Sequence, residues 1–257
     1  MFIPPPRFEI RFYIYPPEEA RPKAEPLRFI LKEDSKLYRY ILLDLDGTLI
    51  DSQEGITNSL RYSFEKIGIE VPCNAFLKKF VGPPLHEAMQ EFCHLSKAQV
   101  DLAMEYFFER YLQKGLYENT PTAGAVELCK KLNSQGYILA IASSKPVDQC
   151  ISICNRFGFS GSMTAIVGSE PCQDWSKEDV IRKALEILGI AEDKMSEVLM
   201  VGDRKYDVYG AKACGINCLG VNFFNYAEPG ELQKAGACTV VTTLDEMESF
   251  IKSNSYQ

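Results

Sequence analysis

The feature that most constrains this 257-residue chain is a short apolar strand that ends in two aspartates. Residues 40–43 (Tyr-Ile-Leu-Leu) are typical of a strand buried on both faces of a parallel sheet. Asp44 and Asp46 follow, and Gly47 predicts a sharp turn after them. Two carboxylates this close are costly to bury unless a cation or a proton offsets their repulsion. The run therefore predicts a Mg²⁺ site in which one carboxylate can act as a nucleophile.

Two later segments place a hydroxyl or an ammonium group next to an apolar strand or an amphipathic helix. Residues 137–142 predict a second buried strand, followed by Ser143 and Ser144. A hydroxyl there can donate to a phosphate oxygen, although capping a helix is the alternative use. Lys177 lies near the start of an amphipathic helix, where a lysine opposes the helix dipole unless an anion is close. The alternative for Lys177 is an ordinary solvated lysine.

A third segment joins an apolar strand at 198–201 to a pair of acids. Gly202 marks the turn, and Asp203 and Asp207 are expected to begin the next helix. Their spacing of four residues puts both on one face, where they can hold a cation and orient a lysine. The alternative is that the acids simply occupy a helix N-terminus, which the dipole favours.

In this order the four segments resemble the motifs of the haloacid dehalogenase (HAD) superfamily of phosphohydrolases. The details are similar to its phosphoglycolate-phosphatase-like branch, which has a helical cap, and the resemblance runs from about residue 40 to 251. It implies that Asp44 is the nucleophile and that Asp46 is the general acid and base. It also implies that Asp203, a carboxylate oxygen of Asp44 and the backbone carbonyl of Asp46 bind Mg²⁺.

The resemblance assigns further residues to the site. Ser143 and Lys177 would hold the phosphoryl oxygens, with Ser144 as the neighbouring hydroxyl, and Asp207 would act through water or by holding Lys177. A loop of Gly82, Pro83 and Pro84 in the cap would touch the leaving group. The sequence departs from the family pattern where Glu178 follows Lys177 in place of a frequent proline, with Lys183 as a fallback lysine. It also has Ser143 where many relatives have threonine.

The predicted fold is α/β: a Rossmann-like, doubly wound parallel sheet with an inserted α-helical cap. Further strands are expected at 138–142, 165–167, 198–201 and 217–221, alternating with helices. Residues 39–52 and 120–257 are expected to form this core. Residues 53–119 form the cap, with helical patterns at 56–67, 75–80, 85–92 and 99–111. Residues 1–38 are an extension, in which 8–15 and 27–31 form a hairpin or are poorly ordered.

Composition limits the partners. The net charge of −7 argues against nucleic acid as the main partner. No apolar run approaches the roughly 20 residues of a membrane span, and no signal-peptide core is present. Nine cysteines without paired metal spacing, and only two histidines, argue against zinc and favour reduced thiols in a cytoplasm. We therefore expect a cytoplasmic monomer or homodimer that binds a small-molecule phosphate ester.

The predicted activity is Mg²⁺-dependent hydrolysis of a small, phosphoglycolate-like phosphate monoester through an aspartyl-phosphate. A sugar phosphomutase is an alternative, with Lys78 and Lys79 available for a second phosphate. A nucleotidase or pyrophosphatase, or a non-catalytic binding protein that uses the N-terminal strand, remain further alternatives. The sequence does not fix the substrate, because specificity depends on a few contacts of roughly 1–3 kcal/mol each.

Overall fold

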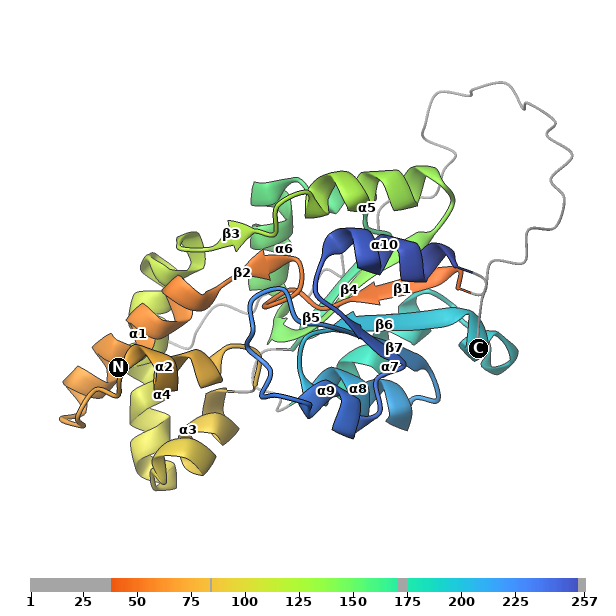
Figure 1. Ribbon diagram of the computed structural model, residues 1–257. Helices are drawn as coiled ribbons and strands as arrows, with labels where there is room; N and C mark the ends of the chain where they lie inside the picture. Colours follow the sequence, from red (N-terminus) through yellow and green to blue (C-terminus); the bar gives the residue numbers. More distant parts are fainter. Residues whose placement is uncertain (1–37, 84, 171–174, 254–257) are drawn as a thin grey trace, which may run out of the picture.

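The computed structural model describes residues 38–83, 85–170 and 175–253, and a six-stranded parallel sheet lies at its centre (Figure 1). The strands lie in the order β5-β4-β1-β6-β7-β8. Each neighbouring pair is parallel, and β1 lies between β4 and β6. The predicted α/β fold with a Rossmann-like parallel sheet is thereby confirmed. The strands are β1 (Tyr40–Leu43), β4 (Ile138–Pro146), β5 (Ala165–Ser169), β6 (Val198–Gly202), β7 (Asn217–Val221) and β8 (Thr239–Val241).

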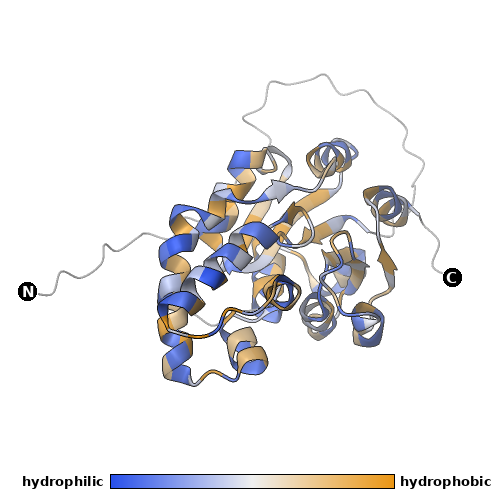
Figure 2. Ribbon diagram, turned by 60° about the vertical axis from the view of Figure 1, so that its left-hand side comes forward, coloured by the Kyte–Doolittle hydropathy of each residue, from blue (hydrophilic) through white to orange (hydrophobic). Residues whose placement is uncertain are grey.

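Helices cover both faces of the sheet because the strands are apolar on both sides. In β1, Ile41 and Leu43 pack into one apolar cluster and Leu42 packs into the other. Figure 2 shows hydrophobic strands enclosed by helices whose outer sides are largely hydrophilic. One face is covered by α5 (Ala125–Ser134), α6 (Val147–Phe157) and α10 (Leu244–Lys252), and the other by α7 (Lys177–Ile187), α8 (Lys205–Ala213) and α9 (Glu231–Ala235) (Figure 1).

The segment at 53–117, called the helical insert below, lies beside the sheet (Figure 1). Its helices pack through apolar side chains such as Leu60, Phe64 and Phe107, which are buried. The chain enters and leaves the insert through two short antiparallel strands, β2 (Ile50–Asp51) and β3 (Thr120–Pro121). The two connections therefore lie side by side. The insert contains α1 (Gln53–Lys66), α2 (Asn74–Leu77), α3 (Leu85–Cys93) and α4 (Lys97–Gln113), and the 3₁₀ turns η2 (Lys78–Phe80) and η3 (Gly115–Tyr117).

Some elements differ from the sequence-based expectations. Strand β4 continues to Pro146, which pairs with Ser169 beyond an irregularity, so Ser143 and Ser144 belong to the strand and do not cap the next helix. The helical pattern expected at 75–80 is one short α-helix followed by a 3₁₀ turn. The short elements β2, β3, β8 and α9 were not predicted, because such short segments carry little periodicity. Helix α10 was also not predicted, although its buried Met247 and Ile251 lie four residues apart, as in an amphipathic helix.

The acid pair also differs in its local structure. Asp203 was expected to begin a helix, but helix α8 begins at Lys205, so Asp203 lies in the turn after β6. The Asp207 side chain accepts a hydrogen bond from the backbone N–H of Arg204 at 3.1 Å, which fixes the helix start there.

The N-terminal hairpin expected from segments 8–15 and 27–31 lies outside the described residues. Tyr38, the first described residue, is buried and its ring stacks on Phe250 with centroids 6.2 Å apart. Among the described helices, none combines the length and apolar character needed to cross a lipid bilayer.

Candidate active site

Three neighbouring strands deliver polar groups to the same edge of the sheet. Leu43 of β1 aligns with Ile141 of β4 and with Val201 of β6. Asp44 follows Leu43 directly, and Ser143 and Asp203 lie two residues past their aligned positions. The carboxyl ends of parallel strands are where open α/β sheets bind ligands. All three side chains belong to buried residues, which identifies this edge as the candidate site.

Lys177 connects the acids of the site. It is the first residue of α7, which begins there because Ser176 caps the helix and accepts a hydrogen bond from the N–H of Asp179. The Lys177 ammonium lies 2.8 Å from Oδ1 of Asp44 and 2.8 Å from Oδ1 of Asp207. It also donates to the carbonyl of Ala142 at 3.1 Å. The two carboxylates supply the anions that offset the helix dipole at this position.

Lys177 stays charged in this setting. Burial alone would lower its pKa, but the carboxylates of Asp207 and Asp44 raise it above its ordinary value. The solvated alternative considered for Lys177 is therefore excluded, since its side chain is only 6% exposed. Asp207 lies where the sequence analysis expected it, against this lysine.

The acids next to Lys177 carry more negative charge than the lysine can balance. Carboxylate oxygens of Asp44, Asp203 and Asp207 lie within 4.8 Å of one another. Neither oxygen of Asp203 has a hydrogen-bond partner among the described residues. Burial raises the pKa of Asp44 to about 6, and burial with the neighbouring carboxylates of Asp207 and Asp44 raises the pKa of Asp203 well above its usual range. The two Asp203 oxygens without donors, clustered with the carboxylates of Asp44 and Asp207, fit a hard cation such as Mg²⁺.

Asp46 is separate from this acid cluster. Gly47, which has a left-handed φ of 77°, turns the chain after it as expected. The Asp46 carboxylate faces a different partner, because its Oδ2 lies 3.0 Å from the ammonium of Lys145. The suggested contribution of Asp46 to a metal site, through its backbone carbonyl, stays a prediction.

Lys145 and Tyr111 are site residues that the sequence analysis did not identify. Lys145 lies two residues after Ser143, and its ammonium donates to the Tyr111 hydroxyl at 2.8 Å. Burial would lower the pKa of Lys145, but Asp46 and Tyr111 raise it above its ordinary value. The available sequence signal was a lysine directly after the two serines at a strand end. No comparable signal marked Tyr111, which comes from α4 of the insert.

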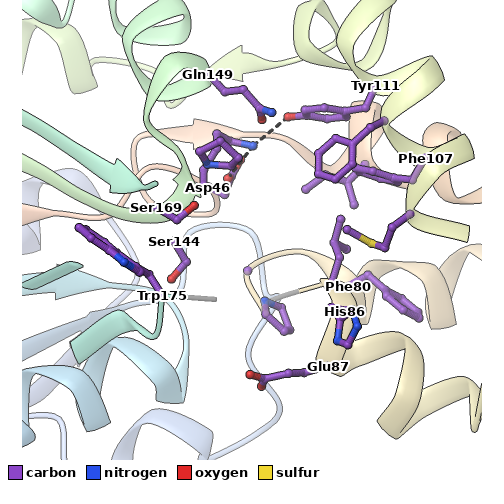
Figure 3. Close-up of a pocket in the computed structure, with 18 of the residues that line it drawn as sticks. Asp46, Phe80, His86, Glu87, Phe107, Tyr111, Ser144, Gln149, Ser169 and Trp175 are labelled. Atoms are coloured by element: carbon purple, nitrogen blue, oxygen red, sulfur yellow. Dashed lines mark hydrogen bonds and ion pairs between the residues drawn. The ribbon is translucent and has the colours of Figure 1, made fainter. Parts of the chain in front are cut away.

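A cavity of about 590 Å³ opens beside Asp46, between the insert and the carboxyl edge of the sheet (Figure 3). Ser144 and Lys145 line it from the sheet, and Gly82 and Pro83 line it from the insert. The predicted substrate loop therefore reaches this cavity at Gly82 and Pro83, whereas Pro84 lies outside the described residues. Aromatic side chains form much of the remaining wall, namely Phe80, Phe107, Phe108, Tyr111 and Trp175.

Arg204 lies in the turn after β6 and contacts the loop that carries Gly82. Its guanidinium donates to the Val81 carbonyl at 2.7 Å and to Glu231 at 3.0 Å. Gly82 has a φ of 99°, and a Cβ atom there would lie 2.6 Å from Cγ of Arg204. The loop thus approaches Arg204 closely enough to require glycine. The sequence analysis gave Arg204 no role, since its partners are distant in sequence.

The chain matches known proteins over most of its length. A 5'-nucleotidase from Pseudomonas aeruginosa is 37% identical over 194 residues, covering 75% of this chain and 86% of that protein. A phosphoglycolate phosphatase from Mesorhizobium japonicum is 29% identical over 190 residues, covering 71% and 82%. The crystal structure of a predicted phosphatase from Clostridium acetobutylicum has a TM-score of 0.78 and 39% identity, and covers 84% of this chain and 98% of that one.

The family model for haloacid dehalogenase-like hydrolases matches residues 41–221, a range that includes every candidate residue from Asp44 to Asp207. The match confirms, at the level of the family, the expected enzyme class of HAD-type phosphoric monoester hydrolases. The matched range contains β1, the helical insert and the turn that carries Asp203, in the order that the sequence motifs predicted. The chain therefore belongs to the haloacid dehalogenase-like hydrolase family.

Proposed function

We propose that this protein is a Mg²⁺-dependent phosphatase that hydrolyses a small phosphate monoester through a phosphorylated Asp44. The observation that carries the proposal is the contact of Lys177 with both Asp44 and Asp207 beside the unpartnered carboxylate of Asp203. This arrangement supplies a nucleophile, a cation for phosphoryl oxygens and an acid set for a metal at one sheet edge. The phosphatase names carried by relatives support the same activity.

In the first half of the reaction, a carboxylate oxygen of Asp44 forms a bond to phosphorus while the bond to the ester oxygen breaks. Asp46 gives its proton to the leaving oxygen. Lys177 and the Ser143 hydroxyl hold the phosphoryl oxygens and offset their charge. Asp44, Asp203 and the backbone carbonyl of Asp46 would hold Mg²⁺, which reduces the repulsion between the phosphate dianion and Asp44.

In the second half, Asp46 accepts a proton from a water molecule, and the water oxygen forms a bond to phosphorus. The bond between Asp44 and phosphorus breaks, so that Asp44 is a carboxylate again and inorganic phosphate leaves. Asp207 keeps Lys177 in place during both halves. The helical insert would act as the cap that excludes bulk water from the cavity.

The test measures phosphate release from a panel of esters with and without Mg²⁺, for the wild type and Asp44→Asn. The panel contains phosphoglycolate, hexose phosphates, nucleoside monophosphates and pyrophosphate. We expect Mg²⁺-dependent release that Asp44→Asn abolishes, and the ranking of kcat/KM identifies the substrate. Absence of release from every compound would refute the proposed phosphatase.

A 5'-nucleotidase is the second candidate function. The aromatic wall of the cavity beside Asp46 suits a flat leaving group, and the cavity of about 590 Å³ lies in the usual range of small-molecule sites. The 37% identical relative that carries this name supports it. A kcat/KM for nucleoside monophosphates above that for phosphoglycolate would favour this candidate over a phosphoglycolate phosphatase.

The phosphomutase alternative finds less support. Lys78 and Lys79, considered for a second phosphate, line a different hollow from the one beside Asp46. Lys79 already pairs with Glu228 at 2.9 Å. A mutase would need both cations to face the same cavity as the acid-base residue. Turnover without an added bisphosphate activator would separate the phosphatase from this alternative.

A further inference from the structure

Among the described residues, only one of the two carboxylate oxygens of Asp46 has a side-chain partner. Its Oδ2 lies 3.0 Å from the ammonium of Lys145, while its Oδ1 is buried and has no hydrogen-bond partner among those residues. Figure 3 shows Asp46 and Tyr111 on the same side of the cavity, with the two dashed contacts between them. The orientation of this carboxylate therefore depends on Lys145.

Lys145 is in turn fixed by the insert. Its side chain is 7% exposed and comes from the extended end of β4, while Tyr111, which receives its hydrogen bond at 2.8 Å, comes from the last turns of α4. The Tyr111 ring is itself immobilised, since it stacks on Phe107 with centroids 5.1 Å apart and an angle of 15° between the planes. A chain of contacts thus runs from Tyr111 of α4 through Lys145 of β4 to Asp46 in the turn after β1.

We propose that Lys145 and Tyr111 are positioning residues that aim the Asp46 carboxylate at the leaving oxygen and make its placement depend on the position of the helical insert. This inference rests on the proposed function, because it requires that Asp46 transfer the proton. A proton donor must lie within about 2.6–3.2 Å of the oxygen that it protonates. A displacement of about 1 Å can cost about 10²-fold in rate, so the contacts that set the rotamer matter.

The alternative roles of Lys145 fit the geometry less well. A lysine that binds the transferring phosphate should lie against the nucleophile, and Lys177 already occupies that place at 2.8 Å from Asp44. A purely structural lysine would not need to line the cavity, yet Lys145, Tyr111 and Asp46 all do. The contacts from Tyr111 through Lys145 to Asp46 therefore lie on the side of the site where the leaving group would bind.

The test compares two esters that differ in their need for a proton. Loss of p-nitrophenolate needs little protonation, whereas loss of an alkoxide needs a proton donor. The kcat/KM of Tyr111→Phe and Lys145→Met is measured with p-nitrophenyl phosphate and with the best alkyl phosphate of the panel, because kcat/KM reports the steps up to loss of the leaving group and excludes the second half of the reaction, which both esters share. We expect kcat/KM for the alkyl ester to fall about tenfold or more, as for a misplaced acid. The kcat/KM for p-nitrophenyl phosphate should stay within about threefold of the wild type.

Matched controls separate this role from general damage. Tyr106→Phe removes a hydroxyl from the same helix α4, and Lys183→Met removes the ammonium that pairs with Glu186 on α7, away from the cavity. Both should leave the ratio of the two kcat/KM values unchanged. Lys145→Arg, which keeps the cation, should recover part of the alkyl-ester activity. If Lys145→Met does not fold, judged by its thermal unfolding, Tyr111→Phe decides the question because it removes one oxygen atom.

The possible failures can be told apart. Equal losses on both esters, or no loss on either, would overturn the positioning role of Lys145 and Tyr111. Asp46→Asn serves as the benchmark, because it should show the strongest dependence on the leaving group. If Asp46→Asn shows that dependence and the two positioning variants do not, the inference fails while the proposed function stands. If the wild type hydrolyses no ester, both fail together.

Discussion

Gly47 lies so close to Asp203 that a Cβ atom on it would be 2.1 Å from Oδ2 of that carboxylate. The two residues are far apart in the sequence, and they meet because β1 and β6 are neighbours in the sheet. Gly47 also has a φ of 77°, a backbone conformation that glycine adopts at no steric cost. The turn after Asp44 and Asp46 therefore has room for the Asp203 carboxylate only because residue 47 is glycine.

The first prediction concerns Gly47→Ala. The methyl group would force Asp203 or the turn to move, and the left-handed backbone adds about 1–2 kcal/mol of strain for a non-glycine residue. We expect phosphatase activity to fall at least about 10²-fold, because a shift of about 1 Å at a catalytic centre has that effect. Steady-state kinetics together with urea unfolding measures both consequences.

Gly68→Ala is the matched control for this substitution. Gly68 has a similar φ of 72°, and nothing lies within 4 Å of a Cβ atom placed there. The variant should lose about as much stability from backbone strain and keep its activity. Equal activity in the two variants would show that the close approach of Gly47 to Asp203 does not affect catalysis.

The second prediction uses metal binding as its readout. A cation that binds the folded protein at one hundred times its Kd stabilises it by about 2.7 kcal/mol. We expect Mg²⁺ to raise the thermal unfolding midpoint of the wild type and to have little effect on Asp203→Asn. Without metal, Asp203→Asn should be the more stable protein, since the substitution removes a buried charge that faces Asp44 and Asp207.

Asp193→Asn is the control for the metal experiment, because Asp193 is exposed and lies in the 3₁₀ turn η5 (Glu192–Glu197). It should respond to Mg²⁺ as the wild type does. A full Mg²⁺ response in Asp203→Asn would contradict the assignment of Asp203 to the metal.

The third prediction concerns the buried pair of Arg204 and Glu231, whose side chains are 6% and 9% exposed. Arg204→Met leaves a buried carboxylate without its cation, which costs about 3–5 kcal/mol of unfolding free energy. The double variant Arg204→Met with Glu231→Leu should recover most of that loss, because neither charge remains. Chemical denaturation of both single variants and the double variant completes the cycle.

Activity should not recover with stability in that double variant. Arg204 also donates to the Val81 carbonyl, and the adjoining Gly82 lines the cavity. We expect KM to stay raised in the double variant, since the loop at Val81 and Gly82 has lost its contact with the turn after β6. A wild-type KM in the double variant would mean that the loop position does not depend on Arg204.

The fourth prediction concerns alkaline pH. Burial raises the pKa of the Cys129 thiol to about 12, from an ordinary value of 9.0. Above pH 9 the thiol ionises in the unfolded chain while it stays neutral in the folded protein. The contribution of Cys129 to stability is therefore present below pH 9 and lost between pH 9 and about 12, with a slope of up to about 1.4 kcal/mol per pH unit.

The measurement is the free energy of unfolding between pH 8 and 11 for the wild type and Cys129→Ala. The variant should lose stability less steeply with rising pH, whatever its starting value. Cys73→Ala, at an exposed position, should keep the wild-type slope. Identical slopes for the wild type and Cys129→Ala would contradict the raised pKa.

The candidate residues Asp44, Ser143 and Asp203 share one property, since each lies at or just past the carboxyl end of a strand that its own neighbours encode. The apolar run before Asp44 predicts a buried strand, and the next glycine predicts the turn, without reference to any distant residue. Parallel strands end at a common edge, so the meeting of Asp44, Ser143 and Asp203 follows from the fold class. Where a hydrogen bond from a side chain fixes a helix start, as the bond from the Arg204 N–H to Asp207 does for α8, the expected boundary was wrong by a few residues.

The sequence by itself determined the α/β sheet, the helical insert and the residues at the strand ends, because these follow from apolar periodicity and short turn signals. Only the tertiary structure decided that Lys145 meets both Asp46 and Tyr111, and that Arg204 holds the loop at Val81. Those contacts join residues from the insert and the sheet. No local pattern sets their distance, since it depends on how the helical insert packs against the edge of the sheet.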